Sequence, residues 1–219
     1  MHSEFRNRIA ALDTASLCDA NPQIRTLDSG IRPVNPGPRL VGRALTVACD
    51  GDFLFVLKAL HEAEEGDVLV ITAHGGRAIA GELFATESLR RKLGGIVVDG
   101  AVRDSHRLAE IPLPVYSRFV HPRAGTANTM SRYHIPVECG GVLIHPGDVL
   151  VGDADGLLVS TVEELKATIP AAEKIQQQEA VVLEGIRQGR SIFEYLNFEE
   201  HYENCLHGRS SALSFVFPG

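Results

Sequence analysis

Residues 53–98 alternate between two kinds of apolar pattern, and this alternation constrains the fold more than any other feature of the chain. Gly66 ends a first segment whose apolar residues share helical spacing: Phe53, Val56, Leu57, Leu60 and Ala63. The run DVLVITA that follows is continuous and short, as in a buried strand. A helix of about a dozen residues is expected after the loop HGGRAIAG, and another buried strand at 95–98. This order predicts an α/β unit with at least one parallel crossover.

The flanking regions predict short elements and one long helix. Asp13 or Thr14 could cap a helix in residues 11–20, and residues 43–48 read as a strand. After residue 114 the apolar runs are brief, and turn sequences such as His-Pro-Gly-Asp and Asp-Ala-Asp-Gly separate them. A long helix is expected at 162–188, with Pro170 either kinking it or standing in the first turn of its main part. We predict one domain with helices beside a strand-rich layer.

Charge and cysteine usage exclude several classes of protein. The chain has 28 acidic and 21 basic residues, a formal charge of −7, so it has no general attraction to nucleic acid or to an anionic membrane. No apolar run approaches the ~18 residues that span a bilayer, and no signal peptide is recognisable. The four cysteines are far apart in the sequence, as expected for free thiols in a reducing compartment. We therefore expect a cytoplasmic protein that binds neither nucleic acid nor membrane.

The segment Gly81-Glu82-Leu83-Phe84 is the first candidate site. A glycine loop that enters a helix leaves backbone N–H groups without intrahelical partners, and these groups can hold a carboxylate or an enolate oxygen. The alternative is a connecting loop whose glycines serve turn geometry alone. The segment by itself does not decide between the two.

The second candidate is the run Asp99-Gly100-Ala101-Val102-Arg103-Asp104. Asp99 and Gly100 are expected to end the buried strand, and active residues of α/β sheets collect beyond such ends. Arg103 offers a planar fork for a substrate carboxylate, and Asp104 offers a hard oxygen ligand for a magnesium-type ion. The alternative is a surface ion pair.

Three motifs carry a resemblance: GEL at 81–83, GGIVVDGAVRD at 94–104 and PGDVLVGDADGLLVS at 146–160. Over roughly residues 10–190 the chain resembles the family of 4-hydroxy-4-methyl-2-oxoglutarate aldolases and the related regulator of ribonuclease E activity A. The resemblance implies a three-layer, swivelling β/β/α domain at 1–197 and a C-terminal tail at 198–219, packed on its own or a neighbouring subunit. It also implies a homotrimer or a homohexamer.

The resemblance also implies roles for particular residues. Gly81, Glu82, Leu83 and Phe84 would bind substrate, Arg103 would bind its carboxylate, and Asp104 would hold a divalent cation, Mg²⁺ or Mn²⁺. The family's acidic residue near the pyruvyl group falls at Glu82, where relatives can carry the shorter Asp. A catalytic glutamate contributed by a neighbouring subunit falls at Glu179.

The expected activity is that of a class II, metal-dependent aldolase that cleaves a 4-hydroxy-2-oxo acid to pyruvate, with oxaloacetate decarboxylation as a side activity. A lysine Schiff base is disfavoured because every lysine lies on a predicted helix among polar neighbours. The alternative is a non-enzymatic regulator that binds a ribonuclease or another protein. That branch tends to lack the Asp after the Arg, so Asp104 favours the enzyme. A sugar acid or an aromatic catabolite also remains open as the substrate.

Four further features are weaker candidates. The cluster His61-Glu62-Ala63-Glu64-Glu65 reads as a solvated helix end, and His106 as a surface residue. Arg123 is either a second anion contact or part of a structural loop. The aromatic residues after residue 192 are expected to pack against this subunit or a neighbour.

Overall fold

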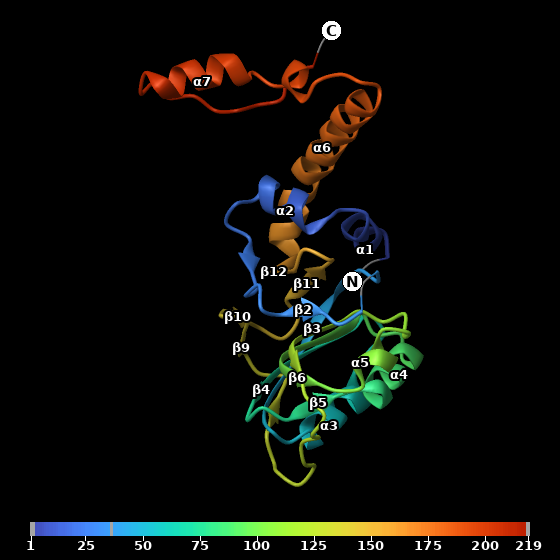
Figure 1. The fold of residues 1–219 in the computed structure, drawn as a ribbon. Coiled ribbons are helices and arrows are strands. Elements are labelled where there is room, and N and C mark those ends of the chain that lie inside the picture. The colour runs from blue at the N-terminus through green and yellow to red at the C-terminus, as the bar shows by residue number, and fades with distance from the viewer. Residues whose placement is uncertain (1–2, 36, 218–219) are drawn as a thin grey trace. The chain divides into compact units, whose positions relative to one another are not determined.

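The computed structural model describes residues 3–35 and 37–217, which form two compact units. The first unit extends to Ile169 and contains the large sheet, and the second begins at Pro170. Helix α6 (Val162–Arg187) passes through the boundary between them (Figure 1). Pro170 lies inside this helix, at its ninth position, rather than in its first turn.

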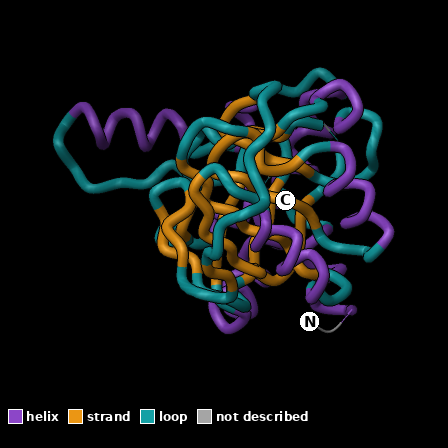
Figure 2. Tube along the Cα trace, turned by 90° about the horizontal axis from the view of Figure 1, so that it is seen from below, coloured by secondary structure: helices purple, strands orange, loops and turns teal. Residues whose placement is uncertain are grey.

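Ten strands of the described residues form one mixed sheet (Figure 2). Its centre consists of four parallel strands in the order β3 (Leu40–Asp50), β4 (Asp67–His74), β6 (Gly95–Val102) and β7 (Val115–Val120). Antiparallel strands extend it beyond β3: β11 (Val149–Gly152), β12 (Leu157–Ser160) and β1 (Arg25–Thr26). Three short strands complete it: β2 (Arg32–Pro33) beside β7, β5 (Ala78–Ala80) beside β6 and β8 (Arg132–Tyr133) beside β3.

Helices and a hairpin cover the two faces of this sheet, so the first unit has three layers. Helices α3 (Leu54–Glu62), α4 (Glu82–Arg90) and α5 (Ser105–Leu108) occupy the connections between successive parallel strands and lie together in Figure 1. The hairpin of β9 (Val137–Cys139) and β10 (Val142–Ile144) contacts β3 and β4. The predicted α/β fold of three layers is confirmed.

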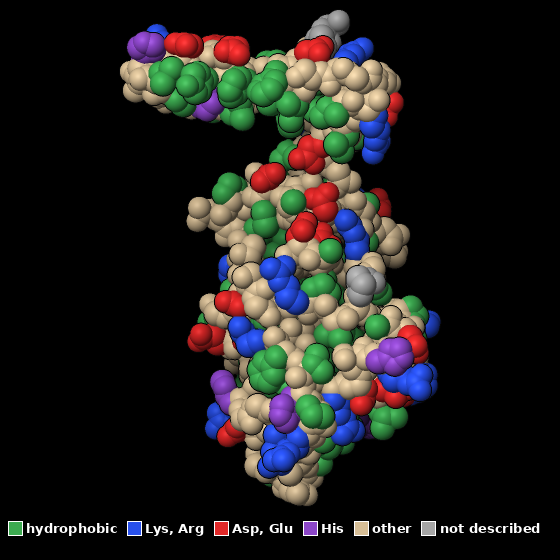
Figure 3. Space-filling view, in the orientation of Figure 1, with side chains coloured by type: hydrophobic (Ala, Val, Ile, Leu, Met, Phe, Trp, Pro, Cys, Tyr) green, Lys and Arg blue, Asp and Glu red, His purple; other side chains and the backbone are tan. Residues whose placement is uncertain are grey.

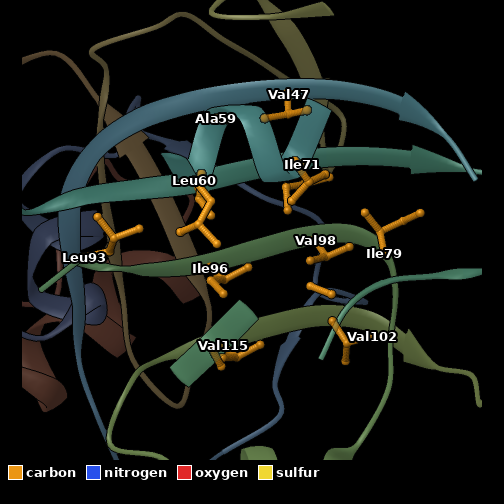
Figure 4. Close-up of a cluster of buried hydrophobic side chains, with 14 of the residues drawn as sticks. Val47, Ala59, Leu60, Ile71, Ile79, Leu93, Ile96, Val98, Val102 and Val115 are labelled. Carbon is orange, nitrogen blue, oxygen red and sulfur yellow. The ribbon is translucent and has the colours of Figure 1, made fainter. Parts of the chain in front are cut away.

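The alternation of side chains along the central strands builds a separate core on each face. In β4, Leu69 and Ile71 join the cluster under the helices, whereas Val68 and Val70 join the cluster on the hairpin side. Figure 4 shows the first cluster, with Ile71, Ile96 and Leu60 converging between strands and α3. Both faces are apolar because both are covered, which explains why the strands read as continuous apolar runs.

The remaining helices lie outside the parallel core. Helix α1 (Ser3–Ala10) precedes α2 (Thr14–Ala20), whose N-cap is Asp13, one of the two predicted candidates. The Asp13 carboxylate accepts a hydrogen bond from the Ser16 N–H at 2.6 Å. No helix of the described residues is long and apolar enough to cross a membrane.

The second unit is small and presents apolar side chains at its surface. A capping box of Ser191 and Glu194 begins the 3₁₀ helix η1 (Ile192–Tyr195), and α7 (Phe198–Leu206) follows. Tyr195 is buried, but no residue of α7 is. Apolar side chains gather along α7 in Figure 3, and Leu206 is 61% exposed.

The structure corrects three details of the sequence prediction. Strand β6 does not end at Asp99 and Gly100 but continues to Val102. Asp99 still pairs with β4, and the absence of a side chain at Gly100 permits close approach to Ala73, which a Cβ would meet at 2.8 Å. The expected loop at 74–81 contains strand β5, and helix α4 has only nine residues. Lys92 follows that helix with a φ of 58°, so the chain has already left the helix there.

Candidate active site

The candidate site is a pocket beyond the carboxyl ends of the parallel strands, where α/β sheets commonly bind ligands. Four segments of the chain meet there: β5 with the start of α4, residues 103–104 after β6, Phe53 after β3, and Ala124 after β7. The lining residues are Phe53, Ala78, Ile79, Ala80, Gly81, Leu83, Phe84, Arg103, Asp104 and Ala124.

Asp104 follows the end of β6, and its side chain forms a hydrogen bond with the start of α4. Its backbone is left-handed, with φ 58° and ψ 35°, a conformation that Asp tolerates better than most residues. Its Oδ2 atom accepts a hydrogen bond from the Glu82 N–H at 3.2 Å and lies 3.5 Å from the Nε atom of Arg103. The two side chains are 38% and 43% exposed, so the pair remains accessible to a ligand.

Gly81 is required for this arrangement because there is no room for a side chain. A Cβ at this position would lie 2.5 Å from Oδ2 of Asp104 and 3.0 Å from Cγ of Arg103. The Arg103 N–H also donates to the Ala80 carbonyl at 3.0 Å, which ties the two segments together. The glycine therefore allows the carboxylate to approach the first turn of α4.

The amino end of α4 supplies further hydrogen-bond donors. The N–H groups of Leu83 and Phe84 lie in the first turn, where the helix itself offers no acceptor. The positive end of the helix dipole adds to their attraction for an anion. The Phe84 ring packs edge-to-face on Phe53, with centroids 5.8 Å apart, which orients this turn against the pocket wall.

A second hollow shares Arg103 and Asp104 with the pocket. Its other lining residues are Ser105, His106, Arg107, Val120 and Pro122. The His106 side chain is 87% exposed, as predicted for a surface residue. The arginine–aspartate pair thus borders both hollows.

The structure brings most of the predicted site residues together. Gly81, Leu83, Phe84, Arg103 and Asp104 line the pocket. Glu82 does not: its side chain is exposed, and only its backbone N–H bonds to Asp104. Glu179 lies on α6 in the second unit, and its role in a neighbouring subunit stays a prediction. The Arg123 carbonyl accepts a hydrogen bond from the Ala78 N–H at 2.9 Å, so its backbone has a structural role in the loop.

Asp52 and Ala124 were not predicted from the sequence to belong to the site, and Phe53 was predicted only as part of a helix. Phe53 and Ala124 form pocket wall, and Asp52 holds the loop that carries Ala124. An Asp just before a predicted helix is a signal for a cap, but nothing in the sequence links it to residues more than 70 positions away.

The buried thiol of Cys49, near the end of β3, does not supply a reactive nucleophile. Burial, with the nearby Asp52 and Asp50 carboxylates, raises the pKa of the Cys49 thiol to about 12, so it is not a thiolate nucleophile at neutral pH. Within the described ranges, no group of three or more His, Cys, Asp or Glu side chains could enclose a metal. The cluster at 61–65 lies at the exposed end of α3, as predicted.

Fold and site together define a class of protein: a three-layer α/β protein with an arginine–aspartate pair at the amino end of a helix. A family model described as RraA-like, Aldolase/RraA, matches residues 14–159. A protein of Halalkalibacterium halodurans with the provisional name 4-hydroxy-4-methyl-2-oxoglutarate aldolase is 37% identical over 79% of this chain and 84% of its own.

Solved structures agree with that match. The RNA-processing inhibitor RraA from Thermus thermophilis is 30% identical, with a TM-score of 0.62 over 67% of this chain and 90% of its own. An uncharacterized protein from Pseudomonas syringae is 26% identical, with a TM-score of 0.76 over 88% and 96% of the two chains. The chain belongs to the RraA-like family, as the resemblance of its motifs implied.

Proposed function

We propose that this protein is a divalent-metal-dependent aldolase that cleaves a 4-hydroxy-2-oxo acid, such as 4-hydroxy-4-methyl-2-oxoglutarate, and releases pyruvate. The observation that carries the proposal is the meeting of Arg103, Asp104 and the amino end of α4 at one pocket. The name of the Halalkalibacterium relative supports an aldolase. Oxaloacetate decarboxylation is proposed as a side activity because it forms the same pyruvate enolate.

Each of the converging groups has a role in binding the pyruvyl part of the substrate. The Arg103 guanidinium presents parallel N–H donors to the carboxylate, which fixes its orientation. The N–H groups of Leu83 and Phe84 donate to oxygen atoms on which negative charge develops during cleavage. These donors are fixed by helix α4, so they need little reorganisation during the reaction.

The donor set fits a hard divalent cation. Asp104 offers one carboxylate, and Mg²⁺ or Mn²⁺ commonly takes only one or two protein carboxylates, with water and substrate as the other ligands. Asp104 would hold the ion, and Gly81 keeps the space beside that carboxylate open. When bound, the ion supplies positive charge that stabilises the enolate oxygen.

The cleavage step breaks the bond between C3 and C4 of the substrate. The C4 hydroxyl loses its proton, the C4–O bond becomes a carbonyl, and the bonding pair remains on the pyruvyl fragment as its enolate. We propose that a water positioned by Glu82, or by Glu179 of a neighbouring subunit, accepts the hydroxyl proton. Protonation of the enolate at C3 then yields pyruvate. The assembly proposed with this role is a trimer or hexamer in the cytoplasm.

The test is pyruvate release from 4-hydroxy-4-methyl-2-oxoglutarate and from oxaloacetate, with and without Mg²⁺ or Mn²⁺. The Asp104→Asn variant keeps a residue that tolerates the left-handed backbone but removes the charge. We expect it to lose metal-dependent turnover by about 100-fold or more while its thermal unfolding stays near wild type. Asp19→Asn, at an exposed position of α2, is the control and should retain full activity.

Activity that is insensitive to EDTA, or full activity in Asp104→Asn, would remove the metal from the proposal. No turnover of either substrate with any metal would favour the second candidate, a regulator that binds a ribonuclease or another protein. That candidate is supported by the 30% identity to the Thermus RNA-processing inhibitor.

A further inference from the structure

Asp52 is a buried carboxylate that lies just outside the pocket lining. Only 3% of the residue is exposed, and its Oδ1 atom accepts a hydrogen bond from the Leu54 N–H at 3.0 Å, at the start of α3. Its Oδ2 atom accepts three more, from the Thr126 hydroxyl at 2.7 Å and from the N–H groups of Asn128 and Thr129 at 2.8 and 3.1 Å. A single side chain thus joins the start of α3 to residues 121–131, here called the 121–131 loop.

Hydrogen bonds make this carboxylate a stable anion in spite of its burial. Desolvation raises the pKa of Asp52, but the hydrogen bonds from Asn128, Thr126, Leu54 and Thr129 outweigh it and hold the pKa well below its ordinary value. The carboxylate is therefore ionised throughout the neutral range.

The 121–131 loop runs from Asp52 to the wall of the pocket. Thr126 exchanges backbone hydrogen bonds with the 51–53 segment, donating to the Gly51 carbonyl at 3.0 Å and accepting from Phe53 at 2.7 Å. Just before Thr126, the Gly125 N–H donates to the Ala78 carbonyl at 2.9 Å, and the Ala78 N–H donates to the Arg123 carbonyl at the same distance. Ala124 lies between these bonds and lines the pocket.

Asp52 also determines the position of Phe53, its neighbour in the chain. Phe53 lines the pocket and packs edge-to-face on Phe84, whose N–H belongs to the first turn of α4. The hydrogen bond between Asp52 and Leu54 fixes the backbone on the other side of Phe53. Two parts of the pocket lining, Phe53 and Ala124, are therefore held by one carboxylate that is not itself part of the lining.

We propose that Asp52 is a positioning residue for the pocket: it holds the 121–131 loop and Phe53 where they close the site around the pyruvyl group. The proposal rests on the proposed function, because the group that the walls enclose is the substrate of that reaction. Displacement of such walls weakens substrate binding, because a pocket holds a small ligand by enclosing most of its surface.

The test compares Asp52→Asn with Asp99→Asn, a matched control. Asp99 also holds a neighbouring segment, since it accepts hydrogen bonds from Arg118 at 2.5 Å and from the Gly140 N–H at 2.6 Å, but it does not line the pocket. We expect Asp52→Asn to lower kcat/KM for pyruvate release about tenfold, mainly through KM. Asp99→Asn should lower the melting temperature while it leaves KM within about twofold of wild type.

Amide hydrogen exchange provides a measurement that does not depend on turnover. The Ala78 and Gly125 amides, which bond the loop to β5, should exchange about tenfold faster in Asp52→Asn and at the wild-type rate in Asp99→Asn. If wild type releases no pyruvate, the proposed function fails, and the exchange rates still decide: faster exchange in Asp52→Asn supports the positioning role. Unchanged exchange overturns it.

Thr126→Val covers the case in which Asp52→Asn does not fold. This variant removes one donor to Asp52 and keeps the charge, so a smaller rise in KM and in the Ala78 and Gly125 exchange rates is expected. Wild-type KM in either folded variant, or an equal rise of KM in Asp99→Asn, would overturn the proposal.

Discussion

At the scale of the residue, two aspartates illustrate how environment decides what a carboxylate does. Asp104 is partly exposed, left-handed in its backbone and adjacent to Arg103, so it is available to a ligand. Asp52 is buried, and its oxygens are occupied by four donors, so its contribution is structural order. The same side chain thus has two proposed roles because burial and hydrogen bonding differ.

The low pKa of Asp52 predicts a pH dependence of stability. A carboxyl whose pKa is lower in the folded state contributes stability above its unfolded pKa, and that contribution is lost as the pH falls through the folded value. We expect the free energy of unfolding of wild type to exceed that of Asp52→Asn by a constant amount between about pH 5 and 8, and the difference to shrink below about pH 4.

Urea unfolding of the two proteins over this pH range measures the difference directly, because the other carboxylates titrate in both. A difference that stays constant down to pH 3 would show that the ionised form of Asp52 has no special stability in the folded state.

At the scale of the element, α4 is a short helix whose amino end, rather than its length, determines its proposed role in the pocket. It begins at Glu82, immediately after a glycine against which the Asp104 carboxylate packs. The segment before it is held by the pairing of β5 with β6 and by the hydrogen bond from the Arg103 N–H to the Ala80 carbonyl. The proposed role of α4 depends on the contact between its amino end and Asp104, which follows β6.

Gly81→Ala tests this connection. The new Cβ would lie 2.5 Å from Oδ2 of Asp104, so the carboxylate must move away from the Glu82 N–H. We expect kcat/KM to fall at least about tenfold, with a melting temperature lowered by only a few degrees. Steady-state kinetics and thermal unfolding measure the two effects.

Gly30→Ala is the control for this prediction, because a Cβ there would also meet a carboxylate, that of Asp28, at 2.7 Å. This position does not line the pocket, and the variant should keep wild-type kinetics. Equal kinetic losses in both variants would mean that the effect is general destabilisation.

At the scale of the whole molecule, the proposed function requires two subunits to complete one active site. Apolar side chains along α7 and at Val181 and Leu183 are exposed in the second unit, a surface typical of subunit contacts. The proposed roles divide one active site between Arg103 in the first unit and Glu179 in the second unit of a neighbour.

Subunit mixing tests this division. Arg103→Lys and Glu179→Gln should each lose activity alone. Coexpressed in equal amounts, they should recover up to about a quarter of wild-type activity, because some sites then combine an intact Arg103 with an intact Glu179. Copurification through two different affinity tags, one on each variant, establishes that mixed oligomers form. Mixed oligomers without recovery would place both residues in the same subunit's site, and full activity in Glu179→Gln alone would remove Glu179 from the site.

Elements determined by local interactions were predictable from the sequence, whereas elements stabilised by pairing between distant segments were not. Helix α3, strand β4 and the cap at Asp13 were predictable because the spacing of apolar residues and local hydrogen bonds determine them. The end of β6 was not, because Asp99 and Gly100 look like a turn. The strand continues because Asp99 pairs with β4 and the residues after Gly100 pair with β5 and β7. The short strand β5 was also missed, since it is stabilised only by its pairing with β6.

The sequence by itself determined an α/β class through the periodicity of its apolar residues. Its contiguous motifs implied the family and the three-layer fold, and they contain part of the pocket lining: Gly81, Leu83, Phe84, Arg103 and Asp104. Only the tertiary structure decided that Gly81 contacts the Asp104 carboxylate and that Asp52 holds the 121–131 loop. Those contacts join residues 22 or more positions apart in the chain. Folding alone brings them together, and no local pattern of side chains encodes the distance between them.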